Sequence, residues 1–238
     1  MELLVVAGFL VVGVAGWIYY QLSDMHRDLE LEKLARRMAM NFRFGLPAEL
    51  RDLLPRFRAL EKAIESGGEF QAGINSITGS WRDRKIAFFD YQWVTSHSYR
   101  RRSWWRGWDD DGEIRRTHQR SAVAVELGVG LQPVLIRPER LVDKALALVG
   151  YEDIDFDLLP EFSDAFYVNS PDRVAARRLV TPELARFFLQ HVRCTVDFVG
   201  PWALLHRDST LTPAQARDLM ELAGRLSELV TREQSRLR

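Results

Sequence analysis

The sequence predicts an α+β protein, in which an N-terminal transmembrane helix precedes a soluble domain with an antiparallel sheet backed by helices. Three observations lead to this fold class. An uncharged apolar run opens the chain, strand-like segments occupy its middle, and helices with proline-marked starts dominate its last third. An alternating strand–helix–strand pattern is missing, which argues against a parallel sheet.

The composition suits one domain plus an anchor. The chain has 238 residues, of which 47% are hydrophobic and 28% are charged. A soluble part of roughly 200 residues can bury a substantial core without a disulfide or metal staple. The 33 basic and 33 acidic residues cancel, so no overall attraction to nucleic acid is expected. A single cysteine, Cys194, excludes an internal disulfide framework.

The apolar run from Leu3 to Ser23 contains no charged side chain. As a helix with a rise of about 1.5 Å per residue it covers roughly 30 Å, the thickness of a hydrocarbon core. Trp17, Tyr19 and Tyr20 lie at its distal end, where aromatic rings favour the headgroup level. A cleaved signal peptide and a buried core helix are the alternatives. No basic residue precedes the run, which is atypical of a signal peptide.

The flanks of this run predict its orientation. Basic residues follow it and none precedes it. Those closest to the run on its C-terminal side are Arg27, Lys33, Arg36, Arg37 and Arg43. Because positive residues stay on the cytoplasmic side, we expect the N-terminus outside and the domain in the cytoplasm, in the inner membrane of a bacterium.

Three segments follow from this organisation: a transmembrane anchor at 1–23, a juxtamembrane helical stalk with its lead-in region at 24–70, and an α+β cytoplasmic domain at 71–235. The stalk carries one apolar stripe, which we expect to pack on the domain or on a second copy of the stalk in a dimer. The stripe consists of Leu31, Leu34, Ala35 and Met38. A short helix is expected from Pro47 to about Leu54.

The middle of the domain predicts a meander of antiparallel strands. Four strands are expected, at residues 74–80, 85–95, 121–127 and 133–137. The second of these leaves neither face polar, so we expect it to be central. A turn at 81–84 joins the first two strands, and Gly128 and Gly130 separate the last two.

The last third predicts mainly helices. A helix is expected at 140–149 and a short strand at 166–168. Three helix starts have an N-cap residue followed by proline, at Ser170-Pro171, Thr181-Pro182 and Thr212-Pro213. A hairpin is expected from residues 195–199 and 202–206 around Gly200-Pro201. The closing helix, at 213–235, carries a long apolar face.

Two stretches carry a resemblance. One runs from Ala72-Gly73-Ile74 through Thr78-Gly79 into Phe88-Phe89-Asp90-Tyr91, and the other pairs Asp153–Phe156 with Pro160-Glu161-Phe162-Ser163. Together they resemble a group of uncharacterised bacterial single-pass membrane-anchored proteins, in which a strand ending in FDY precedes a PEFS-like turn. The resemblance covers about residues 28–230 and implies topology and architecture. It implies no activity and no catalytic residues.

The stretch 97–118 is the candidate contact loop. It holds six arginines, four acidic residues and three tryptophans, and a connection this long in a compact domain is usually functional or disordered. Protein partners or self-association, a membrane surface and nucleic acid are the functional alternatives. A net charge of about +2 weakens the nucleic-acid alternative, so none is expected. The candidate residues are Arg100, Arg101, Arg102, Trp104, Trp105, Arg106 and Trp108.

A structural explanation for this stretch also exists. The loop then folds back on its own sheet, and Asp109–Asp111 neutralise Arg100–Arg102.

Motifs of catalysis, cofactor binding or metal binding are absent from the sequence, so no catalytic residue, cofactor or metal ligand is expected. The histidines at 26, 97, 118, 191 and 206 lack metal-ligand spacing, although His97 and His118 flank the candidate loop at matching ends. Asp153, Asp155 and Asp157 echo a calcium loop, but Leu158 takes the place of the required glycine. Cys194 is interpreted as a small buried hydrophobe.

These observations favour a non-enzymatic binding or assembly module, held at the cytoplasmic face of a membrane by residues 3–23. Its contact with a protein partner or a second copy would run through the candidate loop. The alternative is an enzyme whose site is assembled from scattered residues that form no sequence motif.

Overall fold

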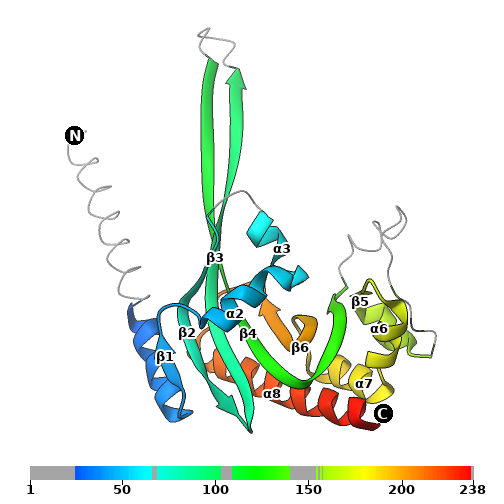
Figure 1. The fold of residues 1–238 in the computed structure, drawn as a ribbon. Helices are drawn as coiled ribbons and strands as arrows, with labels where there is room; N and C mark the ends of the chain where they lie inside the picture. The colour runs from blue at the N-terminus through cyan, green and yellow to red at the C-terminus, as the bar shows by residue number, and fades with distance from the viewer. Residues whose placement is uncertain are drawn as a thin grey trace.

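The computed structural model describes residues 25–236, apart from 66–68, 103–108, 140–153, 155 and 157; the side chains of residues 62 and 97–112 also lie outside the description. Within this part of the chain, six antiparallel strands form one sheet, in the order β1-β2-β3-β4-β5 with β6 beside β4. Helices cover both faces, and a two-stranded arm projects from the sheet (Figure 1). The α+β prediction is confirmed.

Two expected elements lie outside the described residues: the transmembrane span at 3–23 and the helix at 140–149. Among the residues that are described, no helix combines the length and the apolar composition needed to cross a membrane.

The apolar stripe of the expected stalk packs on the sheet. Residues 25–37 are helical, and Leu31, Leu34 and Ala35 are buried in the same hydrophobic cluster as strand residues. The short strand β1 (Asn41–Arg43) then pairs with β2 (Gln71–Trp81). Between them run α2 (Ala48–Leu53), the 3-10 helix η1 (Leu54–Arg56) and α3 (Arg58–Glu65), with Pro47 as the N-cap of α2.

The predicted hairpin of β2 and β3 (Arg84–Arg102) is confirmed, with its turn at the expected residues 81–84. Arg82 and Asp83 both have positive φ, at 45° and 64°, as a two-residue type I′ turn requires. β3 lies between β2 and β4, so its predicted central position is also confirmed. Phe88 faces one hydrophobic cluster and Phe89 the other, as the period of two demands.

The two strands expected at 121–127 and 133–137 are one strand, β4 (Asp109–Pro138), so the predicted break at the glycines is wrong. Gly128 has a φ of +70°, and the pairing register shifts between Glu126 and Leu131. The glycine therefore bends the strand through a bulge without ending it. β4 continues to pair with β5 (Phe166–Asn169), which confirms the short strand expected at 166–168.

The hairpin expected around Gly200-Pro201 is also wrong. Residues 195–207 form a single strand, β6 (Thr195–Arg207), whose two halves both pair with β4. Gly200, with a φ of +57°, bends β6 opposite the bulge in β4, where it pairs with Leu131. In a hairpin, the two halves of β6 would pair only with each other. β4 follows the same bend and pairs with both halves, so residues 195–207 remain one strand.

The helix starts are mostly as expected. Thr181 caps α7 (Pro182–His191), and Thr212 forms a reciprocal capping box with Gln215 at the start of α8 (Pro213–Arg236). The third start is wrong by two residues, because Asp172 caps α6 (Arg173–Leu179) and accepts N–H groups at 3.0 and 2.9 Å. The PEFS segment begins a short helix, α5 (Pro160–Ala165), where a turn was expected.

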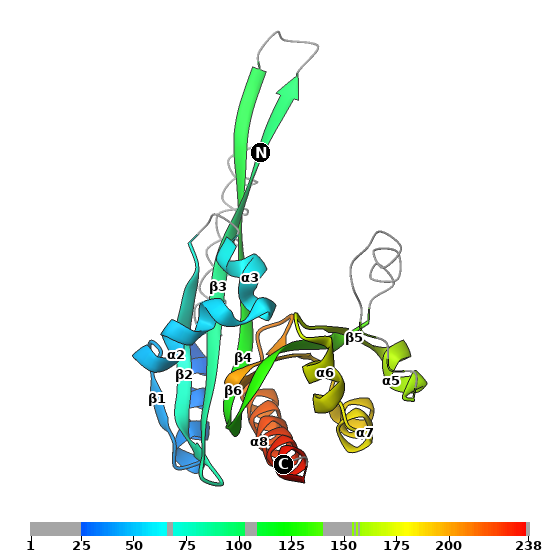
Figure 2. The same ribbon diagram turned by 45° about the vertical axis from the view of Figure 1, so that its right-hand side comes forward.

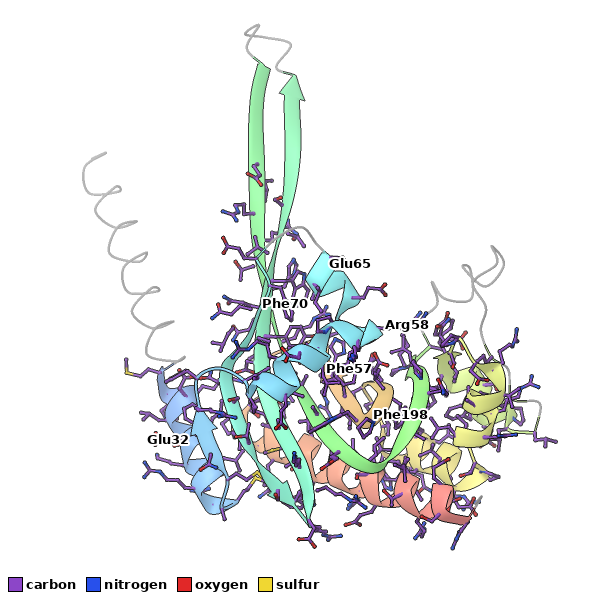
Figure 3. All side chains as sticks on the ribbon, viewed as in Figure 1. Glu32, Phe57, Arg58, Glu65, Phe70 and Phe198 are labelled. Atoms are coloured by element: carbon purple, nitrogen blue, oxygen red, sulfur yellow. The ribbon has the colours of Figure 1, made fainter. Side chains whose placement is uncertain are left out.

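The sheet has a hydrophobic layer on each face. On one face the helix at 25–37, α5, α6, α7 and α8 cover the larger cluster; on the other, α2, η1 and α3 cover the smaller one (Figure 2). Figure 3 shows Phe57, which is fully buried, between the α2–α3 layer and the sheet, and Glu32 on the outer side of the N-terminal helix. A sheet covered on both faces explains the apolar patterning of β3.

A buried ion pair joins the N-terminal helix to the centre of the sheet. Asp90 of β3 is fully buried and accepts two hydrogen bonds from the Arg27 guanidinium, at 2.7 and 3.0 Å. Ser121 of β4 donates to the same carboxylate at 2.5 Å, and Asn75 of β2 lies 3.4 Å from it. Arg27 also donates to the carbonyl of Leu211 at 2.9 Å. One carboxylate therefore connects three strands, the N-terminal helix and the segment before α8.

Replacing Arg27 by methionine tests the weight of this pair. Methionine retains much of the aliphatic bulk but leaves the buried Asp90 carboxylate without its cation, so the free energy of unfolding should fall by about 3 kcal/mol. Urea denaturation of the detergent-solubilised full chain measures the change. The control is Arg36→Met on the same helix, where an exposed pair with Glu32 should contribute less than about 1 kcal/mol. An equal loss of unfolding free energy in both variants would show that the buried pair stabilises the fold no more than the exposed pair does.

Candidate functional site: the arm and the basic pocket

The arm is the part of β3 and β4 that extends beyond the other strands. β2 last pairs with β3 at Gln92, and β6 last pairs with β4 at Ser121, whereas β3 and β4 stay paired out to Arg102 and Asp109. From Trp93 to Arg102 the ribbon is two-stranded and extends roughly 30 Å at a rise of about 3.3 Å per residue. Figures 1 and 2 both show it standing clear of the helices.

The arm corrects the expectation of a long loop at 97–118, because most of that stretch is strand. The ladder places Arg100, Arg101 and Arg102 opposite Asp111, Asp110 and Asp109. Opposite charges on facing positions favour such a register, but the expected neutralisation stays a prediction because the side chains of these residues lie outside the description. The expected folding back of the stretch on its own sheet is wrong, since β3 and β4 continue as a paired ribbon. Of the candidate contact residues, Trp104, Trp105, Arg106 and Trp108 lie outside the described residues.

A stack of aromatic rings supports the base of the arm. Trp93 stacks on Tyr91 and on His118, with ring centroids 5.8 and 4.9 Å apart, and the Arg120 guanidinium lies 4.8 Å from the Trp93 ring centroid. His118 also contacts Thr95 at 2.9 Å. The expectation that His97 and His118 occupy matching ends is wrong, because His118 pairs with Trp93 and His97 pairs with Ile114.

Asp197 of β6 is a buried carboxylate at the N-terminus of α3. One of its oxygens accepts the backbone N–H of Ala59 at 2.9 Å, and the other has no hydrogen-bond partner among the described residues. Burial raises the pKa of Asp197 to about 7, although the backbone N–H groups of Ala59 and Arg58 oppose the shift. The Arg58 side chain, in turn, donates to Asn169 of β5.

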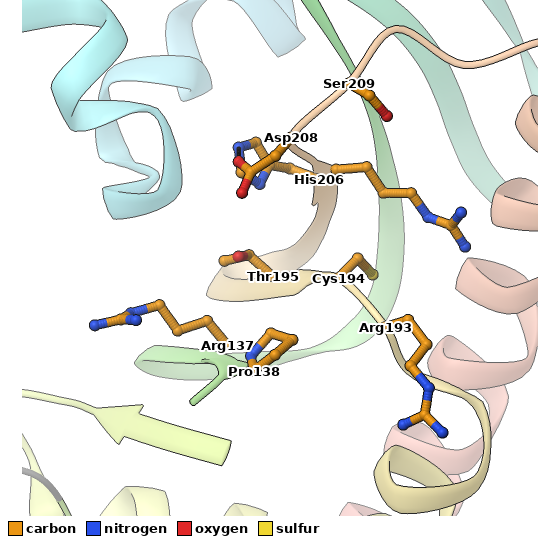
Figure 4. A pocket seen from close by; sticks show the side chains of 9 residues that line it. Arg137, Pro138, Arg193, Cys194, Thr195, His206, Asp208 and Ser209 are labelled. Atoms are coloured by element: carbon orange, nitrogen blue, oxygen red, sulfur yellow. Dashed lines mark ion pairs between the residues drawn. The ribbon is translucent and has the colours of Figure 1, made fainter. Parts of the chain in front are cut away.

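A basic pocket lies where the two ends of the bent strand β6 meet the end of β4. It has a volume of about 410 Å³. Arg137 and Arg193 lie on opposite sides of it, with Cys194 and Thr195 between them and His206 and Asp208 across the cavity (Figure 4). Its lining consists of Arg137, Pro138, Arg193, Cys194, Thr195, His206, Arg207, Asp208 and Ser209.

Sequence reasoning did not find this pocket. Its residues come from three separate stretches, and no spacing in the chain relates Arg137 to Arg193 or Arg207. The signal in the sequence was the presence of glycines at 128 and 200. In the structure both have positive φ and bend β4 and β6 together, which brings the strand ends to one cavity. The buried role of Asp90 had a clearer signal, an acidic residue between Phe89 and Tyr91 in a strand with two apolar faces.

The pocket offers no activated thiol. Cys194 is buried, and burial raises the pKa of its thiol to about 12, so the thiolate is scarce at neutral pH. Over the residues that the structure describes, no three His, Cys, Asp or Glu side chains are placed to hold a metal ion. The calcium echo at Asp153, Asp155 and Asp157 lies outside those residues.

Comparison with known proteins shows a similarity of fold but no family. No family model matches the chain, and no curated protein matches it. A solved structure that it resembles is the crystal structure of the mycobacterial trehalose monomycolate transport factor A, TtfA, with a TM-score of 0.54 and 14% sequence identity. The match covers 87% of this chain and 95% of that chain. At this identity the similarity establishes a shared fold and nothing further.

The raised pKa of Asp197 predicts a specific pH dependence. The folded state holds the proton more tightly than the unfolded chain, so the free energy of unfolding should fall as pH rises from about 4 to about 7, by on the order of 4 kcal/mol. Asp197→Asn should remove this slope. Urea denaturation at about pH 4.5, 6 and 7.5 measures it.

The exposed carboxylate of Asp218 on α8 provides the matched control, and Asp218→Asn should leave the slope in place. A slope that survives Asp197→Asn would assign the pH dependence to another group.

Proposed function

We propose that this chain is a membrane-tethered, non-enzymatic binding and assembly module, whose arm contacts a partner at the membrane surface. The observation that carries the proposal is that the arm leaves the sheet on the side where the N-terminal helix begins.

The contacts of the N-terminal helix define that side. Arg27, near its start, contacts Asp90, beyond which β3 continues into the arm. Met40, just after its end, lies against Gly79 near the opposite end of the hairpin. The helix therefore runs against the direction of β3, and its start is the end nearest the arm (Figure 1).

The predicted span at 3–23 ends close to this point. From Asp90 to Arg102 the strand extends roughly 40 Å at about 3.3 Å per residue. If the span anchors the chain, the arm extends toward the membrane and reaches its surface or a protein within it. Tethering raises the effective concentration of the arm for partners there, so a modest affinity suffices.

The chemistry of the arm favours a protein partner. A two-stranded ribbon leaves backbone N–H and C=O groups on both outer edges, which can pair with an added strand. Ile114, at 47% exposure, is an apolar side chain on this ribbon, and tryptophan and arginine at its end are the residue types that dominate protein interfaces. A net charge of about +2 over 97–118 gives little attraction to nucleic acid.

The fold similarity to TtfA supports an accessory role, since that protein is named a transport factor. For the enzyme alternative we consider the basic pocket, a polar cavity lined by several titratable side chains. There the Cys194 thiol is held neutral, and arginines make up most of the charged lining. Such a lining suits binding better than acid–base chemistry.

The anchor and its orientation have a direct test. In a Cys194→Ala background, a cysteine at position 2 should react with an impermeant maleimide from outside intact cells, and a cysteine at position 236 only after permeabilisation. The full chain should stay with membranes in alkaline carbonate. Release by carbonate, or the opposite labelling pattern, contradicts the tether.

The arm has its own test, in which residues 96–115 are replaced by Asn-Gly. Thr95 and Arg116 face each other in the ladder, so a two-residue turn can close the shortened ribbon without disturbing the sheet. We expect the melting temperature to change by less than about 3 °C, because no described arm residue belongs to either hydrophobic cluster beyond Trp93. A photo-crosslinking residue at position 104 of the intact chain should capture a defined membrane-associated partner in cells.

The same photo-crosslinking residue at position 225, on the exposed face of α8, is the control and should not capture that partner. Crosslinking of position 104 only to lipid would indicate a contact with the bilayer surface. Equal capture from both positions, or capture of the partner from position 225 in the shortened chain, would contradict a contact made by the arm.

A further inference from the structure

We propose that the basic pocket binds an anion bearing a phosphate group. This site is separate from the arm, and it does not depend on the membrane tether. It rests on the charges, the hydrogen-bonding groups and the shape of the cavity described above.

Two arginines of the pocket have no carboxylate partner among the described residues. Its lining holds three arginines, Arg137, Arg193 and Arg207, and one acid, Asp208. That acid is already engaged by Arg120 of β4 at 3.0 Å, and it lies 3.8 Å from His206 Nε2. No carboxylate of the described chain forms an ion pair with Arg193 or Arg207. Arg193 and Arg207 therefore bring two positive charges that no described carboxylate pairs with.

Arg207 is the sharpest indication of a ligand. Its Nε atom is buried and has no hydrogen-bond acceptor among the described residues. A buried donor without an acceptor destabilises the folded chain, and a charged donor does so more strongly. An anion in the pocket would supply that acceptor and remove this destabilisation.

The remaining groups suit phosphate better than a simple carboxylate. Thr195 and Ser209 bring hydroxyl groups, which donate to phosphate oxygens alongside guanidinium groups. The guanidinium of Arg137 is positioned by the Tyr167 ring, 4.4 Å from its centroid. The two arginines without a carboxylate partner suit a phosphate group, which carries one negative charge as a diester and up to two as a monoester. The Cys194 thiol, which is neutral at physiological pH, does not compete for the arginines.

The shape of the pocket allows more than phosphate alone. A volume of about 410 Å³ lies in the range of small-molecule sites and exceeds what one phosphate fills. The phosphate group is therefore the shared chemistry of the ligand, and its organic part comes either from a soluble metabolite or from a lipid headgroup.

Cys194 gives a reporter inside the pocket, because it is the single cysteine of the chain. The full chain in a neutral detergent is alkylated by N-ethylmaleimide, with and without inorganic phosphate, at ionic strength matched by chloride. We expect phosphate to slow the alkylation of Cys194 at least about threefold, in a saturable way. Isothermal titration with phosphate should give the same half-saturation concentration.

Two variants assign the effect to the pocket. Arg193→Gln removes an exposed guanidinium, so its fold should be preserved, and Arg207→Gln removes the buried donor. Each should weaken the protection by phosphate about tenfold or more, whereas Arg225→Gln, which removes an exposed arginine of α8, should not. Circular dichroism and the melting temperature establish that each variant is folded.

Two further experiments distinguish the sources of the phosphate group. Glycerol 3-phosphate is added in detergent, and the chain is separately placed in nanodiscs with and without phosphatidylglycerol. Protection by inorganic phosphate or glycerol 3-phosphate supports a soluble ligand, and protection only in phosphatidylglycerol nanodiscs supports a headgroup. Protection of Cys194 in none of these experiments, or protection that is unchanged in both Arg193→Gln and Arg207→Gln, overturns the proposal.

Discussion

The ion pair between Arg27 and Asp90 is the constraint on which the arrangement of the molecule depends. A carboxylate buried in the middle of a sheet is tolerated only with a cation and further hydrogen bonds, and here Arg27 and Ser121 supply them. The guanidinium can reach Asp90 only if the helix at 25–37 lies along the sheet with its start toward the arm. A single charge pair thereby fixes the direction from which the N-terminal segment approaches the domain.

The second organising feature is the shared bend of β4 and β6. Gly128 and Gly200 take up positive φ values at the bulge, and the strands stay paired on both sides of it. One consequence is a bent sheet, and helices cover both of its faces. The other is that the two ends of β6 close around the basic pocket. β4 thus links the two candidate sites, since it forms half of the arm at one end and part of the pocket lining at Arg137 and Pro138.

Local signals predicted most of the elements. Apolar residues on both faces of residues 85–95, Phe88 and Phe89 among them, predicted a central strand. The N-cap residues before proline at Thr181 and Thr212 predicted helix starts where the structure has them. The errors share a cause. At 128–130 and at 200–201, glycine and proline were interpreted as ends of strands, because a sequence does not reveal whether a neighbouring strand follows the same bend. The arm was interpreted as a loop because its charged residues do not show in the sequence that they face one another across a ladder.

The sequence by itself determined the α+β class, the antiparallel sheet, the closing helix and the concentration of tryptophan and arginine in one stretch, since each follows from local periodicity or composition. Only the tertiary structure decided that this stretch is a projecting ribbon, that Asp90 is paired with Arg27, and that Arg137, Arg193 and Arg207 line one cavity. These features depend on contacts between residues far apart in the chain. Their geometry follows from strand register and curvature, which no local pattern of side chains encodes.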